Sequence, residues 1–317
     1  MNEQEENEAK RFRILVAIDG SEESYSSLRY AARLGQGVDA DITLLYVRRM
    51  DQGLNSGGLQ VRVARENILE WGLDLPGIRY LRKGREILIE EGHMEADWEP
   101  RTVHKEVLGD PLGDHMIEYV NDAGKLIRLR LRIASDIESG ILDQQEQGQH
   151  QLILLGSYNQ KNRAVFPLMG IAPVALKVAL HAPCSVIVTR EMEQGRGHLL
   201  CVDGSPEALE MVRNDAQIAS RCQCPVTLFS VARDEAGGEA SDLALKEAEA
   251  ELAKLGITPK AVKRIIGNPV EEICTEGKNH SVIVLSGRSK QSLKRFFMGN
   301  TAMNVIQHAV NTVMVVR

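Results

Sequence analysis

The chain opens each of its two halves with the same pattern of apolar and polar positions. A short apolar run ends in Asp-Gly-Ser, a helix-length stretch follows, and a second apolar run ends in valine. These segments are residues 13–19, 25–35 and 42–47 in the first half, and 198–203, 207–220 and 226–231 in the second. An apolar run that ends in Asp-Gly-Ser predicts a buried strand, a tight turn and the start of a helix.

The two halves also end alike. Apolar runs at residues 151–155 and 281–285 each lead into a loop that begins with glycine and serine. The stretches 181–190 and 308–317 both begin with histidine and end in a valine-rich run followed by arginine. Strands that alternate with helix-length segments predict βαβ units, a parallel sheet and right-handed crossovers.

We therefore predict an α/β protein made of two tandem, doubly wound parallel-sheet domains. The first domain spans residues 11–190 and the second spans residues 196–317. The polar stretch 191–196 contains Gly195 and should form the boundary between them.

The first domain carries extra residues in its middle. The interval from Asp19 to Gly156 is about 54 residues longer than the interval from Asp203 to Ser286. The difference must lie within about residues 51–135. Two segments there, 106–111 and 126–133, both resemble the third core strand of the domain. The pattern does not decide between them, and the other one should belong to the insertion.

Composition fits two globular domains and restricts the partners. A chain of 317 residues is about two domains long, and an aromatic content of 4% favours aliphatic cores. The net charge of −6 argues against nucleic acid as the main partner. No apolar run reaches the roughly 20 residues of a membrane span. The acidic start is unlike a signal peptide, and five scattered cysteines are typical of reduced thiols. We therefore expect a cytoplasmic protein.

The order of strand, Asp-Gly-Ser, helix, strand ending in valine, and glycine-containing loop before a helix resembles the universal stress protein family. The resemblance covers residues 196–317 almost completely and covers the two ends of the first half. It implies the fold of that family, which is like that of the adenine-nucleotide α-hydrolases. In its nucleotide-binding members, an acid after the first strand and backbone groups after the second strand bind adenine. A loop of the form Gly-x2-Gly-x9-Gly-Ser/Thr holds the phosphates, because glycine lets the backbone approach an anion.

The resemblance implies candidate nucleotide-binding residues in both halves. In the second half they are Asp203, Val231, Ser286, Gly287, Ser289, Gly299 and Asn300, and in the first half Asp19, Val47, Gly156, Asn159 and Gly170. Serines stand at two glycine positions of the second loop. In the first loop the spacer is one residue longer and Ile171 offers no hydroxyl. We expect ATP or another adenine nucleotide to bind, more readily in the second domain, with Mg²⁺ only alongside the nucleotide.

Three functions remain open. The first is a non-catalytic stress-response or signalling protein whose halves pair as a pseudo-dimer through the final strands 185–189 and 312–316, with a further homodimer as an option. The second is an interaction or scaffold protein that has lost nucleotide binding in both domains. The third is an enzyme that slowly hydrolyses ATP or transfers a nucleotidyl group. No catalytic motif and no dedicated metal site are evident in the sequence. The Asp-Gly-Ser segments also favour a turn by themselves, whether or not a ligand binds there.

Two further features suggest structural roles. Arg128, Arg130 and Arg132 alternate with apolar residues, which on a strand places three cations on one face. Such a row can contact an acidic partner or a nucleotide, but it is more often a solvated face. Cys222 and Cys224 have no second pair of ligands nearby, so we interpret them as packing or surface thiols.

Overall fold

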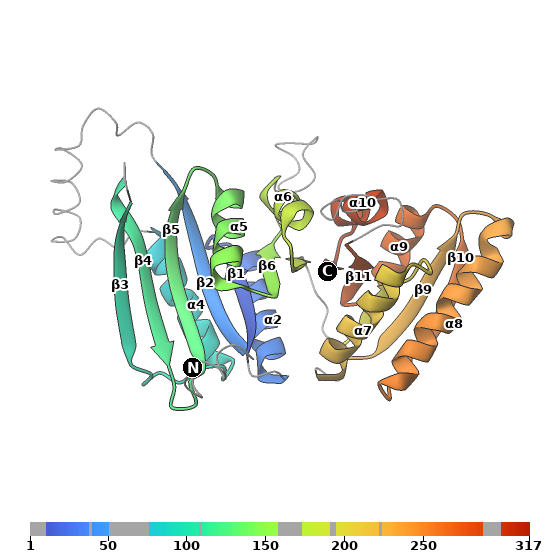
Figure 1. Ribbon diagram of the computed structural model, residues 1–317, viewed down its shortest axis with the longest axis horizontal. Helices are drawn as coiled ribbons and strands as arrows, with labels where there is room; N and C mark the ends of the chain where they lie inside the picture. The colour runs from blue at the N-terminus through green and yellow to red at the C-terminus, as the bar shows by residue number, and fades with distance from the viewer. Residues whose placement is uncertain are drawn as a thin grey trace. The chain divides into compact units, whose positions relative to one another are not determined.

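The computed structural model describes residues 11–37, 40–50, 76–107, 110–157, 173–190, 195–221, 224–287 and 299–317. The chain divides into two compact units, Met1–Gly156 and Ser157–Arg317. Figure 1 shows the elements of each unit, coloured from blue at the N-terminus to red at the C-terminus. Both units are built from a largely parallel sheet with helices packed on its faces, as the sequence predicts.

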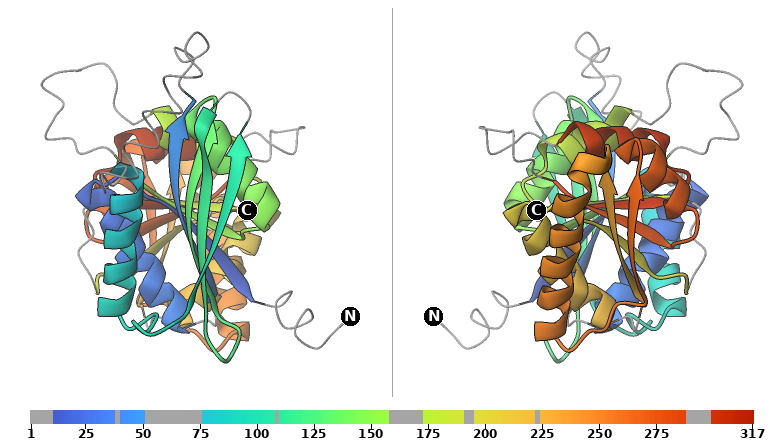
Figure 2. Two further views of the ribbon diagram at one scale, coloured as in Figure 1. Left: turned by 90° about the vertical axis from the view of Figure 1, so that its left-hand side faces the viewer. Right: turned by 90° about the vertical axis from the view of Figure 1, so that its right-hand side faces the viewer.

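The first unit contains one mixed sheet with the strand order β6-β1-β2-β5-β4-β3. Its strands are β1 (Phe12–Ala17), β2 (Ala40–Arg49), β3 (Pro100–Val107), β4 (Asp110–Val120), β5 (Leu126–Ala134) and β6 (Leu152–Gly156). Its helices are α2 (Glu22–Gly37), α4 (Pro76–Glu90) and α5 (Ile137–Gly148). The left view of Figure 2 shows α2 and α4 on one face of this sheet and α5 on the other.

The third core strand of the first unit is β5. It pairs parallel with β2, so that Ile42 lies opposite Ile127. The competing segment, residues 106–111, instead spans the end of β3 and the start of β4, which form an antiparallel hairpin. β4 pairs antiparallel with the outer edge of β5. The inserted residues of the first half therefore include a hairpin that extends the sheet beyond its parallel core.

The arginines of β5 are paired with acids, so they do not form a solvated row of cations. The Arg128 side chain donates to Glu118 at 2.7 Å, and Arg130 lies 3.7 Å from Asp114, both acids on β4. Arg132 is only 9% exposed, pairs with Asp143 on α5 at 3.3 Å and also donates to the side chain of Gln147. The neighbouring strand and helix thus supply polar partners that let three arginines lie on a half-covered face.

The second unit has the strand order β10-β9-β8-β11-β12-β7. Its strands are β7 (Ser185–Thr189), β8 (His198–Cys201), β9 (Val226–Ala232), β10 (Ala261–Ile266), β11 (Val282–Ser286) and β12 (Thr312–Val316). Its helices are α6 (Pro173–His181), α7 (Pro206–Arg221), α8 (Gly238–Lys254), α9 (Pro269–Gly277) and α10 (Asn300–His308), with a short 3₁₀ turn at Glu235–Gly237. The right view of Figure 2 shows this unit, in which β8 to β12 run parallel.

The last strand of the first repeat pairs with the last strand of the second repeat. β7 runs antiparallel to β12, with Ile187 opposite Met314. Helix α6 and strand β7, which close the first repeat in sequence, thus belong to the second compact unit. The domain boundary at residues 191–196 stays a prediction, since residues 191–194 lie outside the described part of the chain.

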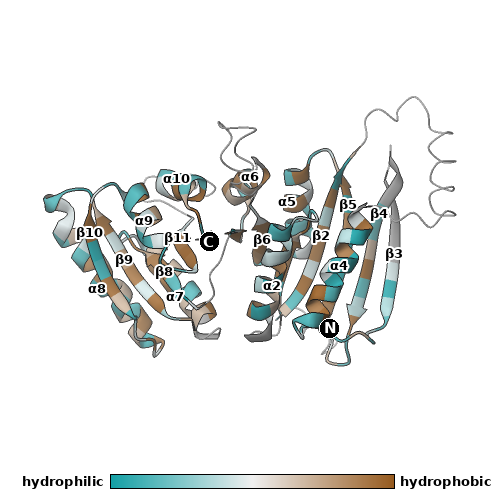
Figure 3. Cartoon of the chain, turned by 180° about the vertical axis from the view of Figure 1, so that it is seen from behind, coloured by the Kyte–Doolittle hydropathy of each residue, from teal (hydrophilic) through white to brown (hydrophobic). Residues whose placement is uncertain are grey.

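The cores are aliphatic, as the low aromatic content predicts. Leu15, Val16, Leu200 and Val284 are fully buried on their strands. Figure 3 shows apolar residues gathered on strands such as β11, whereas helices such as α4 alternate between apolar and polar positions. This pattern is typical of helices that cover a buried parallel sheet.

Three cysteines among the described residues, Cys184, Cys201 and Cys274, are free thiols. Burial raises the pKa of the Cys184 thiol to about 12, which keeps it protonated and poorly reactive. Cys224 is disulfide-bonded. The expectation of reduced thiols is therefore wrong for Cys224.

Candidate functional site

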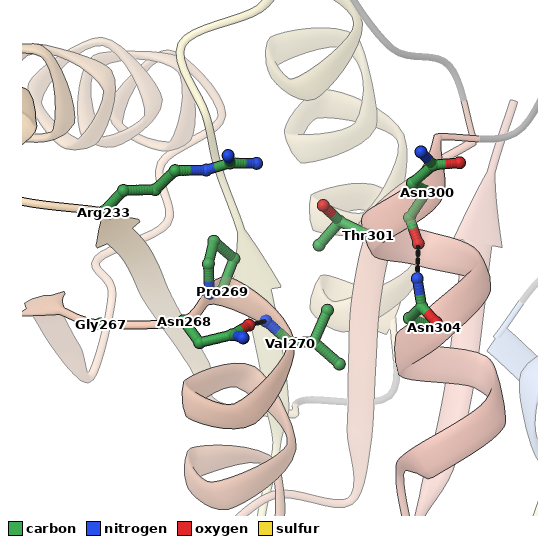
Figure 4. Close-up of a pocket in the computed structure, with 8 residues that line it drawn as sticks. All are labelled: Arg233, Gly267, Asn268, Pro269, Val270, Asn300, Thr301 and Asn304. Atoms are coloured by element: carbon green, nitrogen blue, oxygen red, sulfur yellow. Dashed lines mark hydrogen bonds between the residues drawn. The ribbon is translucent and has the colours of Figure 1, made fainter.

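A pocket of about 430 Å³ opens at the carboxyl ends of the strands in the second unit. Its lining comes from the segments that follow β9 and β10 and from the first turn of two helices. The lining residues are Arg233, Gly267, Asn268, Pro269, Val270, Asn300, Thr301 and Asn304 (Figure 4). Both the volume and the position are typical of ligand sites in open α/β sheets.

The two helices that begin at the pocket are capped differently. At α9, the side chain of Asn268 accepts a hydrogen bond from the Val270 amide at 3.0 Å. At α10, the N-cap is Gly299, which has extended backbone and makes no side-chain capping bond. The first turn of α10 therefore presents amides that no N-cap side chain satisfies. Helix N-termini carry partial positive charge, so both helices favour an anion at this place.

The charge of the pocket lining also favours an anion. Arg233 is exposed, and it is the one charged residue among the eight that line the pocket. Figure 4 shows its side chain extending from the end of β9 across the start of α9. The remaining lining residues are neutral, and none carries a carboxylate that would repel an anion. A guanidinium and two helix N-termini around one pocket are donors of the kind that phosphate and other oxyanions accept.

The predicted adenine-side residues lie at the same edge of the sheet as the pocket. The Val202 amide donates to the Phe229 carbonyl at 2.9 Å, so β8 and β9 end side by side. Asp203 follows β8, and Val231 is the second-last residue of β9. The Gly267 amide donates to the Ala232 carbonyl at 2.9 Å, which ties the pocket loop to the end of β9. Neither Asp203 nor Val231 lines the pocket itself.

The Asp203 carboxylate is exposed and holds the turn after β8. Its Oδ1 accepts hydrogen bonds from the Ser205 amide at 3.0 Å and from the Ser205 hydroxyl at 2.6 Å. The Ser205 hydroxyl in turn accepts from the Ala208 amide at 3.1 Å and so caps α7. One carboxylate oxygen of Asp203 therefore makes all the hydrogen bonds that the Asp-Gly-Ser turn needs, and the side chain stays accessible to solvent.

The predicted loop residues are distributed around the same edge. Gly299 and Asn300 form the start of α10, and Asn300 lines the pocket. Ser286 ends β11, and the Gly287 amide donates to the Val316 carbonyl at 2.8 Å. Ser289 lies outside the described residues. The structure thus brings Asn300 into the pocket and places Ser286 and Gly287 at a neighbouring strand end.

The sequence comparison assigns the family. The profile of the universal stress protein family matches residues 10–67 and 198–317, which together make up more than half of the chain. The chain belongs to the universal stress protein family. No curated protein matches this universal stress protein closely enough to be considered a relative.

Two solved structures agree in fold over nearly the whole chain. A universal stress protein from Archaeoglobus fulgidus DSM 4304 is 16% identical, with a TM-score of 0.63, and the match covers 96% of this chain and 98% of that one. A Pseudomonas aeruginosa UCBPP-PA14 protein assigned to the same family is 14% identical, with a TM-score of 0.61, covering 98% and 94%. A shorter universal stress protein from Archaeoglobus fulgidus, solved in complex with dAMP, is 19% identical and covers 38% of this chain and 97% of its own, with a TM-score of 0.33.

The first repeat of this universal stress protein has the same turn but a different cover over it. Asp19 Oδ1 accepts from the Ser21 amide at 2.9 Å, as Asp203 does from Ser205. A Cβ added at Gly20 would lie 2.6 Å from the ring of Tyr80 on α4, so the aromatic ring packs directly on the turn. At the equivalent Gly204, the nearest atom is the methyl group of Ala244 on α8, at 3.2 Å.

The other first-repeat positions are held by packing contacts. Val47 is 9% exposed and faces Gly140 on α5, where a Cβ would approach it to 2.6 Å. A Cβ at Gly156 would lie 2.8 Å from the backbone nitrogen of Ser24, so this glycine lets β6 approach α2. Asn159 and Gly170 lie outside the described residues.

Sequence reasoning missed most of the pocket lining. The segment Gly267-Asn268-Pro269 lies outside the loop motif of the resemblance, although an Asn before Pro is a recognisable N-cap signal. Thr301 directly follows the predicted Asn300, Asn304 lies one helical turn further along α10, and neither has a sequence signal of its own. An arginine after a strand is common, so nothing in the sequence singled out Arg233.

Two features are absent from the described residues. Within the described ranges, no helix is long and apolar enough to cross a membrane. The same residues contain no cluster of three or more His, Cys, Asp or Glu side chains that could hold a metal ion.

Proposed function

We propose that this universal stress protein is a non-catalytic stress-response or signalling protein whose second repeat binds an adenine nucleotide such as ATP. The observation that carries the proposal is the convergence of Arg233 with the N-termini of α9 and α10 on one pocket without acidic lining. Phosphate groups match these donors in charge and geometry. The nucleotide, rather than protein side chains, would hold any Mg²⁺ ion that accompanies it.

Each residue has a distinct part in this proposal. The Asn300 and Thr301 amides and the Thr301 hydroxyl donate to phosphate oxygens at the start of α10, and Arg233 neutralises their charge. Asp203 and the backbone at Val231, at the ends of β8 and β9, would meet the adenine ring. The carboxylate of Asp203 is exposed, so it can still accept a hydrogen bond from an exocyclic amine.

A non-catalytic role follows from the chemistry of the lining. Arginine, asparagine, threonine, proline, valine and glycine supply donors and shape, but none of them titrates near neutral pH as a general acid or base does. The pocket is built to hold an anion and has no described side chain placed to activate water or a nucleophile. We therefore propose that the nucleotide acts as a signal and not as a substrate.

The decisive experiment is a calorimetric titration of the full chain with ATP and Mg²⁺, comparing wild type with Arg233→Gln. Loss of a charge-assisted contact should weaken ATP binding by about tenfold or more, whereas adenosine, which lacks phosphate, should be affected little. Arg264→Gln is the matched control, because Arg264 is a neighbouring arginine that pairs with Asp242 and does not line the pocket.

The other two functions are outcomes of the same experiment. A flat trace up to millimolar ATP would leave the scaffold function as the better interpretation. Phosphate release well above the background of Arg233→Gln would instead favour the ATP-hydrolysing enzyme. Saturable binding without turnover supports the proposal made here.

We also propose that the two repeats form an internal pseudo-dimer through β7 and β12, alone or within a further homodimer. The antiparallel pairing of these strands satisfies backbone groups that a parallel sheet leaves open at its edge. Independently tumbling repeats in solution scattering would rule this out. We also propose that the protein acts in the cytoplasm. The free thiols of Cys184, Cys201 and Cys274 suit a reducing environment, whereas the disulfide-bonded Cys224 does not.

A further inference from the structure

Each repeat ends in an arginine that directly follows the paired strands. Arg190 follows β7 and Arg317 follows β12. The Arg190 amide donates to the Thr312 hydroxyl at the start of β12, at 3.1 Å. The Arg317 amide donates to the Ser185 hydroxyl at the start of β7, at 3.2 Å. The two arginines therefore occupy equivalent places on either side of the β7·β12 pair.

The Arg190 side chain, from the first repeat, binds the last helix of the second repeat. Its Nη2 donates to the Ile306 carbonyl in α10, and its Nη1 donates to the Asn311 carbonyl at 3.3 Å. Its Nε donates to the Ser157 hydroxyl at 3.2 Å, just after β6. Arg190 is only 9% exposed, so its bonds to these partners form away from water and resist screening.

The Arg317 side chain makes the reciprocal contacts with the first repeat. Its Nη2 donates to the carbonyls of Ala179 at 2.7 Å and Leu180 at 3.0 Å in α6, and its Nη1 donates to the Ala182 carbonyl. Ala179 has the same spacing from Arg190 in the sequence as Ile306 has from Arg317. The side chain also covers Gly287, where a Cβ would lie 2.8 Å from Arg317 Cγ.

These contacts cap two helix C-termini across the repeats. The last carbonyls of a helix have no partner inside the helix and carry partial negative charge, which a guanidinium neutralises. The pseudo-symmetry extends to His181 and His308, whose Nδ1 atoms each lie 2.8 Å from the carbonyl oxygen four residues earlier. Each repeat thus relies on an arginine of the other repeat to hold the end of its last helix.

The Arg190 contact reaches the candidate pocket through α10. Asn300, Thr301 and Asn304 line the pocket at the start of this helix, and Ile306 meets Arg190 near its end. A helix of nine residues is about 13 Å long and moves as a nearly rigid rod. Where Arg190 fixes the end of α10, it therefore also fixes the direction of the amides that face the pocket.

We infer that Arg190 is a positioning residue for the pocket of the second repeat, and that Arg317 holds α6 in the equivalent way. The claim about α10 stands on the hydrogen bonds alone. The claim about ligand affinity rests in addition on the nucleotide binding proposed above. The first repeat thereby controls the geometry of a site whose lining belongs entirely to the second repeat.

Amide hydrogen exchange on the full chain tests the positioning without any ligand. Arg190→Gln should speed exchange in α10 by about tenfold, because a lost charge-assisted bond frees the helix end. Arg317→Gln should speed exchange in α6 and leave α10 close to wild type. Faster exchange confined to residues 185–190, or spread evenly over the second unit in both variants, would overturn the inference.

A titration with ATP and Mg²⁺ tests the consequence for binding. Arg190→Gln should weaken ATP binding by about tenfold, and Arg190→Lys, which keeps a charged donor, should recover most of it. Arg213→Gln is the control, because Arg213 is an exposed arginine on α7 that pairs with Glu251. Unchanged affinity in Arg190→Gln would refute the positioning role in binding. If wild type binds no ATP, the proposed function fails, and the exchange data still decide the role of Arg190.

Discussion

Acidification should destabilise the first unit, because it buries two histidines that stay neutral in the folded chain. His93 is 2% exposed and packs against Gly35, and His150 is 3% exposed with its Nε2 3.1 Å from the Thr43 hydroxyl. Burial, with Lys125 nearby, lowers the pKa of His93 to about 4. Burial, with Arg128 and Arg13 nearby, likewise lowers the pKa of His150 to about 4.

The sign and size follow from proton linkage. Both pKa values in the folded chain lie below the value of 6.5 expected in the unfolded chain. The stability that comes from the neutral histidines is therefore fully present above pH 6.5 and is lost as the pH falls toward 4. In this range the histidines bind protons in the unfolded chain but stay neutral in the folded chain. A gap of about 2.5 pH units is worth roughly 3.4 kcal/mol per histidine, or about 7 kcal/mol for both. That is comparable to the whole stability of a typical domain.

Two other buried groups, Asp41 and His198, act with the opposite sign. Burial raises the pKa of Asp41 despite its contacts with Leu126 and Arg11, so protonation of this group in acid opposes the loss. In the second unit, burial lowers the pKa of His198, but the Asp215 carboxylate beside it raises this pKa by more. The pKa of His198 therefore lies above its usual value. The stability from His198 is present below pH 6.5 and is lost as the pH rises, so it does not contribute to the acid effect.

Tryptophan fluorescence can follow the first unit by itself. The chain has two tryptophans, Trp71 and Trp98, and both precede residue 156. Urea unfolding monitored by fluorescence at several pH values between 7.5 and 4.5 gives the unfolding free energy of the unit that contains them. His93→Gln and His150→Gln should each remove up to about 1.4 kcal/mol per pH unit from the slope. His308→Gln, at an exposed histidine of α10 in the second unit, is the control.

Two results would refute the role of the buried histidines. If the fluorescence-detected unfolding free energy is constant from pH 7 to pH 5, the histidines are not held neutral by burial. If both variants retain the wild-type slope, the acid sensitivity arises from carboxylates instead.

Two more predictions concern stability. Asp215→Asn should lower the free energy of unfolding by about 3–5 kcal/mol, because His198 and Asp215 are both buried, with His198 Nδ1 2.9 Å from Asp215 Oδ2, and one charge would lose its partner. Circular dichroism during urea unfolding measures this loss, with Asp242→Asn at an exposed position as the control. Gly156→Ala should cost about 1–3 kcal/mol, because its methyl group would press on the α2 backbone. Gly237→Ala, where the nearest atom is 3.5 Å away, should be nearly neutral in thermal unfolding.

The sequence predicts most of the parallel core because most of its strands have a recognisable local pattern of apolar residues. The predicted run 42–47 lies inside β2, and the predicted run 226–231 lies inside β9. The third core strand of the first unit is ambiguous in the sequence, because residues 106–111 and 126–133 both have a strand-like pattern. Long-range pairing with β2 selects β5, which buries Ile127, Leu129 and Leu131 on one face. A local pattern contains no information about that partner.

The candidate site was predictable only where a motif marks it. The resemblance led to Asn300, which lines the pocket. Arg233 could be identified only from the structure, in which the end of β9 and the starts of α9 and α10 line the same pocket. Arg190 and Arg317 were noticed only as the ends of matching strands. Their function as helix caps depends on the antiparallel pairing of β7 with β12, which joins residues more than a hundred positions apart.

The repeated Asp-Gly-Ser motif identifies the fold better than it identifies a ligand. Gly20 and Gly204 both have positive φ, at 88° and 72°, so the turn needs glycine in both repeats whether or not a nucleotide binds. The same carboxylate-to-serine bonds form in both. What differs is the cover over the turn, an aromatic ring from Tyr80 in the first repeat and a methyl group from Ala244 in the second. The less crowded turn belongs to the repeat that also has the anion-favouring pocket, and this favours the second repeat as the place to test for a nucleotide.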